Sequence, residues 1–127
     1  MKFDVHKTAA EVYFMIAEEQ DTLYTSEKDD TKKIALRIVA AQNYFYAAVN
    51  FIEAVFAKKL EKHSFNHENR MRTLLENRNL LSEDIIRLYE LVDRDQRNKV
   101  TYRGENGEKY KNIKKLAQLL REQYEQI

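Results

Sequence analysis

Apolar residues recur at steps of three and four along most of the chain, which is the spacing of amphipathic helices. The longest such pattern covers about residues 31–60. It consists of Ile34, Ile38, Ala41, Phe45, Ala48, Ile52 and Val55. A second stripe of Tyr44, Phe51 and Ala54 widens the apolar face. A helix with so broad an apolar face is expected at the centre of a bundle, packed on several sides.

Four further segments show the same periodicity, over about residues 5–24, 66–77, 82–103 and 108–126. The apolar stripe of the first is Ala9, Val12, Tyr13, Ile16 and Leu23. Asn66 and Ser82 are expected N-caps, because a short polar side chain there accepts a hydrogen bond from the first turn. Ser26 or Thr31 is expected to cap the long central helix.

Nothing in the chain shows the two-residue alternation of a half-buried strand, and we find no internal repeat. Both glycines, Gly104 and Gly107, lie in a short polar segment that predicts the turn between the last two helices. The sequence therefore predicts an all-α fold. It is a four- to five-helix bundle with a long central helix (about residues 31–60), in a single domain of residues 1–127.

Composition excludes several functional classes. The 127 residues are 43% hydrophobic and 34% charged, as in a globular domain. The absence of cysteine excludes disulfides, thiolate metal sites and a cysteine nucleophile. No apolar run is long enough for a membrane span, and the N-terminal segment lacks the features of a signal peptide. We expect a cytoplasmic protein without a bound metal or cofactor.

The formal net charge of +1 conceals an asymmetry along the chain. Residues 1–30 carry 3 basic and 8 acidic side chains, whereas residues 94–115 carry 8 basic and 3 acidic ones. A local basic region attracts phosphate even in a nearly neutral protein. The simpler interpretation, which we favour from charge alone, is that the two segments are solvated helix faces packed near each other.

Two histidines, His63 and His67, are four residues apart, and on a helix that spacing can bind a metal. They fall in a polar connection without a Glu-x-x-His pair, so a surface pair is the better interpretation. Arg94, Arg97 and Thr101 share one face near the end of the fourth helix. Arginine binds phosphate bidentately, but bases at a helix C-terminus also complement its dipole.

The chain resembles the HEPN domain superfamily, helical proteins of prokaryotic toxin–antitoxin, defence and RNA-processing systems. The resemblance covers about residues 31–122. It rests on three features: Tyr44-Phe45-Tyr46-Ala47-Ala48 through Phe51-Ile52-Glu53-Ala54, the following loop with His67 and Arg70, and Leu88-Tyr89-Glu90-Leu91 leading into Arg97-Asn98.

The resemblance implies a phosphate-binding site and a homodimer. Active members of the family have an arginine and a polar residue four to six positions before a histidine, and two such motifs meet across a dimer to cleave RNA without a metal. Arg97 and Asn98 match the first half, but Tyr102 stands near the histidine position and no histidine follows His67. A tyrosine with a pKa near 10 donates a proton but is a poor base at neutral pH.

The family also includes toxins modified by a partner nucleotidyltransferase on a tyrosine two positions after the histidine. Gly104 occupies that place here, so the modification does not carry over. We therefore expect binding of RNA or a nucleotide, with weak or absent cleavage. Arg97 would hold phosphate, and Asn98 would orient Arg97 or the ligand. Tyr102 would donate a hydrogen bond. Arg94 and Arg103 would add positive charge. Two alternatives stay open: an active ribonuclease that uses His67, and a non-catalytic protein-interaction subunit.

Overall fold

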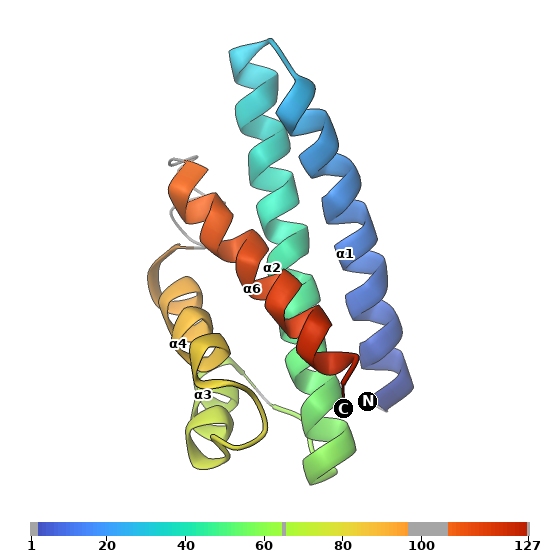
Figure 1. The fold of residues 1–127 in the computed structure, drawn as a ribbon, viewed down its shortest axis with the longest axis vertical. Helices are drawn as coiled ribbons and strands as arrows, with labels where there is room; N and C mark the ends of the chain where they lie inside the picture. Colours follow the sequence, from blue (N-terminus) through green and yellow to red (C-terminus); the bar gives the residue numbers. More distant parts are fainter. Residues whose placement is uncertain (1–2, 65, 97–106, 127) are drawn as a thin grey trace.

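The computed structural model describes residues 3–64, 66–96 and 107–126. In these segments the chain forms five α-helices and one π-helical turn. They are α1 (Phe3–Ser26), α2 (Asp30–Leu60), α3 (His67–Glu76), α4 (Glu83–Leu91), the π-helical turn η1 (Val92–Gln96) and α6 (Gly107–Tyr124). The prediction of an all-α bundle around a long central helix is confirmed. Figure 1 shows α1 and α2 as a long antiparallel pair, with α6 crossing them.

Polar side chains set the starts of three helices. Asn66 accepts a hydrogen bond from the Asn69 amide, and Ser82 accepts one from the Ile85 amide, as the sequence predicts. The start of α2 corrects the expectation of Ser26 or Thr31, because the residue that caps it is Asp29. Its carboxylate accepts a hydrogen bond from the Lys32 amide at 2.8 Å. A carboxylate at this position also complements the helix dipole.

The core is centred on α2. Twelve of its residues are buried, and small and aromatic side chains alternate among them: Ala40, Ala41, Tyr44, Phe45, Ala47, Ala48, Phe51, Ile52, Glu53, Ala54, Val55 and Phe56. Alanines at helix contacts allow the axes to approach closely, and the aromatic rings fill the spaces beside them. The predicted stripe is confirmed from Ala41 onward, whereas Ile34 in the first turns stays exposed.

The face of α1 that enters the core differs from the predicted stripe. Ala10, Phe14 and Ala17 are buried against α2, whereas Val12 and Leu23 are exposed. Phe14 packs edge-on against Phe51 of α2, with 6.5 Å between ring centroids. The helix therefore has two apolar stripes, and among the described residues one of them is packed in the core while much of the other is exposed.

A polar contact joins α6 to the acidic first helix near the C-terminal end of that helix. Tyr110 donates a hydrogen bond to Asp21 at 2.6 Å, and Lys114 donates to the other carboxylate oxygen of Asp21 at 2.6 Å. Burial and this carboxylate raise the pKa of Tyr110 well above its usual value. The packing of an acidic segment against a basic one, expected from the charge pattern, is thus present between α1 and α6.

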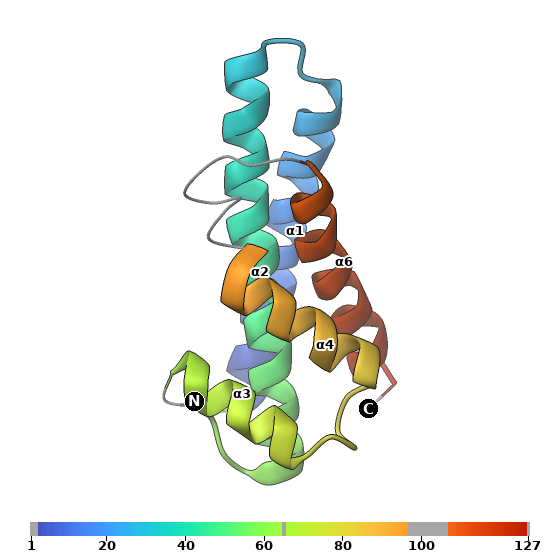
Figure 2. The same ribbon diagram turned by 90° about the vertical axis from the view of Figure 1, so that its left-hand side faces the viewer.

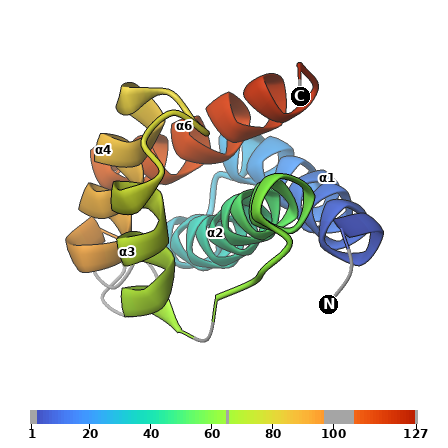
Figure 3. The same cartoon turned by 90° about the horizontal axis from the view of Figure 1, so that it is seen from below.

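Two short helices, α3 and α4, lie on one side of α2 (Figures 2 and 3). The fourth helix changes its type before the described segment ends. Its α-helical part ends at Leu91 and continues as the π-helical turn to Gln96. The predicted end at residues 99–103 and the predicted glycine turn before Gly107 lie outside the described residues.

Candidate functional site

Of the predicted site residues, Arg97, Asn98, Tyr102 and Arg103 lie outside the described residues. Arg94 is in η1, where its side chain is exposed and donates a hydrogen bond to Glu90 at 3.0 Å. Both partners are accessible to water, so the pair contributes little to stability. The pair of Arg94 and Glu90 therefore breaks at little cost in free energy.

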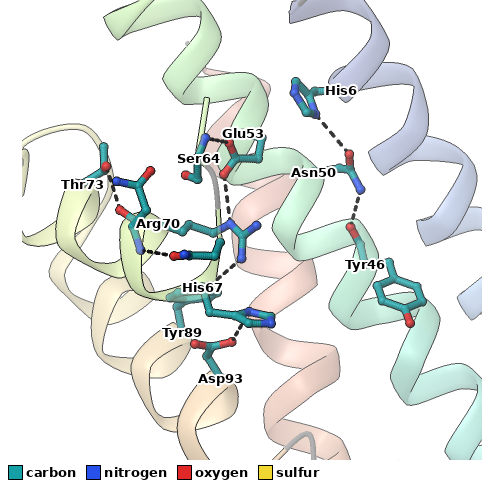
Figure 4. A network of polar contacts seen from close by, with 12 residues as sticks. His6, Tyr46, Asn50, Glu53, Ser64, His67, Arg70, Thr73, Tyr89 and Asp93 are labelled. Atoms are coloured by element: carbon teal, nitrogen blue, oxygen red, sulfur yellow. Dashed lines mark hydrogen bonds and ion pairs between the residues drawn. The ribbon is translucent and has the colours of Figure 1, made fainter. Parts of the chain in front are cut away.

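The structure brings His67 to the end of α4. His67 is the first residue of α3, and its Nδ1 atom lies 3.2 Å from Oδ1 of Asp93 in η1 (Figure 4). The imidazole is about half exposed, whereas the Asp93 side chain is only 11% exposed. The carboxylate and the imidazole are within ion-pair distance, so the Asp93 side chain lies directly against the ring. An accessible imidazole therefore lies against a largely buried carboxylate.

A buried charge network holds α3 in place beside this pair. Glu53 of α2 is 4% exposed. Arg70 of α3 donates to Glu53 Oε2 at 2.9 Å and to the hydroxyl of Tyr89 in α4 at 3.2 Å (Figure 4). The amide of Ser64 donates to Glu53 Oε1 at 2.7 Å. Glu53 therefore has partners on both carboxylate oxygens, as a buried carboxylate requires.

The buried network shifts the proton affinities of its members. Burial raises the pKa of Tyr89 to about 12, against the opposing effect of Arg70. For Arg70, burial alone would lower the pKa, but the contacts with Tyr89 and Glu53 outweigh it and the pKa is raised. Arg70 thus stays charged, and Tyr89 stays a neutral hydroxyl at physiological pH.

The two contacts form a ladder between α3 and the end of α4. His67 and Arg70 are three residues apart on α3, and their partners Asp93 and Tyr89 are four apart. Positions three and four apart share a helix face, so the two pairs lie one above the other. The ladder fixes the end of α4 against the start of α3. The chain then leaves the described structure three residues after Asp93, at the basic segment 97–103.

In the sequence, the family resemblance includes His67, Arg70, Tyr89 and Glu53. No sequence pattern indicates which of these side chains contact each other. One signal was present. Between Arg37 and Lys58 the only charged residue is Glu53, and an isolated charge on an apolar helix requires a buried partner. Asp93 gave no signal, because its pairing with His67 depends on how α3 packs.

Within the three described segments, no three histidine or carboxylate side chains converge as a metal site requires. None of the helices described is both long and apolar enough to cross a membrane. Comparison of the chain with protein-family models, with curated proteins and with solved structures found no match.

Replacing Arg70 with alanine is expected to lower the free energy of unfolding by about 3–5 kcal/mol, because the buried Glu53 carboxylate loses its charged partner. Urea denaturation followed by circular dichroism measures this. Arg78→Ala removes an exposed arginine paired with Glu83 and should cost less than about 1 kcal/mol. Equal losses in the two variants would contradict a buried network. Combining Glu53→Gln with Arg70→Met should restore part of the stability, since neither charge then stays buried alone.

Stability is expected to fall between pH 10 and pH 12, because folding raises the pKa of Tyr89 from its usual 10 to about 12. In this window the unfolded chain loses the phenolic proton and the folded chain keeps it, so rising pH favours unfolding. Tyr44 and Tyr110, whose pKa values are also raised, contribute in the same direction. Tyr89→Phe should therefore show a shallower decline, by on the order of 2 kcal/mol at pH 12. Parallel declines in the two proteins would exclude this contribution of Tyr89.

Proposed function

We propose that this chain is a HEPN-like helical protein that binds RNA or a nucleotide through phosphate contacts at the end of α4. The observation that supports this most is the ladder of Arg70–Tyr89 and His67–Asp93. It fixes the end of α4 beside an accessible imidazole, immediately before the basic segment that contains Arg97 and Arg103. A helix end that carries the exposed Arg94 and leads into a segment rich in basic residues is suited to an anionic ligand.

The roles we propose follow from the side chains. Arg97 holds a phosphate, because its planar guanidinium donates two parallel hydrogen bonds. Asn98 orients Arg97 or the ligand, and Tyr102 donates a hydrogen bond or stacks on a base. Arg94 and Arg103 add positive charge. By its resemblance, the protein would be a cytoplasmic component of a toxin–antitoxin or defence system, act as a homodimer and have a nucleotidyltransferase as a possible partner protein.

Arg97→Ala is expected to weaken binding to single-stranded RNA and to reduce its dependence on salt. Each lost phosphate contact should lower the slope of log K against log salt by about 0.7. Fluorescence anisotropy with a labelled oligonucleotide at several salt concentrations measures both effects. Arg78→Ala removes the same charge from the exposed pair with Glu83 and should leave the slope unchanged. Identical slopes for the wild type and Arg97→Ala would refute the phosphate site.

The pair of His67 and Asp93 favours a second candidate, a metal-independent ribonuclease. In this version Arg97 and Tyr102 act together with His67, which supplies the proton-transfer group that the segment after Arg97 lacks. Histidine is the side chain that most often acts as a general base or acid, and His67 lies against the Asp93 carboxylate. His67 is accessible to a ligand because its side chain is 54% exposed.

Cleavage of RNA in the presence of a chelator distinguishes the two candidates. If the protein is a ribonuclease, His67→Ala should abolish cleavage and preserve RNA binding, since the imidazole moves protons and Arg97 holds the phosphate. His63→Ala, in the same connection between helices, is the matched control and should keep activity. Binding without cleavage in the wild type supports a binding protein. Neither binding nor cleavage would favour the protein-interaction subunit.

A further inference from the structure

The outer surface of α1 has an apolar stripe that the described core does not use. Val5, Val12 and Leu23 are 50%, 44% and 56% exposed, although the residues between them on the inner face are buried. With Ala9 and Ile16, which are half-buried, they recur at steps of four, three, four and seven. This is the heptad spacing with which one helix packs against another. Glu19 occupies the one polar position in the series.

The stripe continues onto α2 and into a shallow hollow. The rings of Tyr13 and Tyr46 lie 5.4 Å apart across the two helices, and Tyr46 and Val39 of α2 are exposed. The hollow, of about 660 Å³, is lined by Asp4, Val5, Thr8, Ala9, Val12 and Tyr13. Figure 3 shows α6 on one side of the α1–α2 pair and no helix of the described segments on the opposite side.

The α2 part of this face is uncharged, whereas the α1 part carries Glu19 in the stripe and Asp4 at the hollow. Residues 38–52 of α2 contain no charged side chain, in a chain that is 34% charged overall. A solvated helix face normally carries charges, whereas the centre of a protein interface is depleted of them. The face composed of the α1 stripe, Tyr46 and Val39 therefore has the composition of a contact surface.

We propose that this face is the dimer contact, in which the α1 stripe packs antiparallel against the same stripe of a second copy. The order of side chains along the stripe is nearly the same from its N-terminal end as from its C-terminal end. Val12 falls opposite Ile16 of the second copy, and Val5 falls opposite Leu23. A two-fold contact requires such self-complementarity, and a stripe fitted to an unrelated helix does not.

The charges also select the antiparallel direction. In a parallel pair, Glu19 would face Glu19 of the second copy, and like charges in contact are destabilising. In the antiparallel pair, Glu19 falls opposite Ala9, beside the hollow. The stripe from Val5 to Leu23 is roughly 27 Å long at the rise of an α-helix. This inference names a surface for the proposed homodimer, and its failure would leave the RNA-binding site untouched.

Analytical ultracentrifugation tests the contact. The wild type is expected to be a dimer at micromolar concentration. Val12→Glu should raise the dissociation constant by about 100-fold, since the dimer then places two charges in an apolar contact. Leu91→Glu is a matched control, because Leu91 on α4 is also 44% exposed. It should leave the dimer intact. Circular dichroism verifies that both variants stay folded.

Cysteine cross-linking tests the direction, because the chain has no cysteine of its own. A mixture of Val5→Cys and Leu23→Cys proteins should form a disulfide-linked dimer on mild oxidation, and neither variant alone should do so efficiently. Efficient linkage of Val5→Cys to itself would overturn the antiparallel arrangement. A monomeric wild type, or equal effects of Val12→Glu and Leu91→Glu, would overturn the contact itself.

Discussion

The burial of α2 is the constraint on which the rest of the molecule depends. Its apolar side chains are covered by α1 on one side and α6 on another, and the third side meets α3 and α4. Along its buried length the only charge is Glu53. A carboxylate in that position is tolerated only with full hydrogen bonding and a countercharge. A cation must therefore pack beside Glu53, and Arg70 is that cation.

The position of α3 follows from that pair. This helix of 10 residues has few apolar side chains to bury, and Thr73 and Leu74 are its only fully buried residues in the described structure. The contacts of Arg70 with Glu53 and Tyr89 consequently set how α3 is rotated and where it lies against α2 and α4. His67 is fixed one turn away, where it meets Asp93. The exposed imidazole of His67 thus owes its position to the buried ion pair between Arg70 of α3 and Glu53 of the central helix.

Local signals in the sequence predicted the helices and two of their caps, because periodicity and capping are properties of neighbouring residues. The start of α2 was assigned wrongly, since Ser26, Asp29 and Thr31 are all good caps and only packing chooses among them. The prediction of which face of α1 enters the core was also wrong. Both of its stripes are apolar, and periodicity cannot tell a core from an interface. The pairing of His67 with Asp93 spans 26 residues, so no local pattern reveals it, and the basic segment 97–103 stays a prediction.

The two outward features of the molecule lie apart, and this has a consequence for mechanism. Helix α1 is at one edge of the bundle, whereas α4 lies beyond α2 at the other edge (Figure 3). Family resemblance implies two motifs that meet across a dimer. A dimer formed through α1 would instead hold the two α4 ends far from the two-fold axis, so that each copy needs its own proton-transfer group. If the protein cleaves RNA, His67 beside Asp93 of the same chain would be that group. A dimer through α1 and a site assembled within each copy are therefore compatible, whereas a site shared between copies would require a different interface.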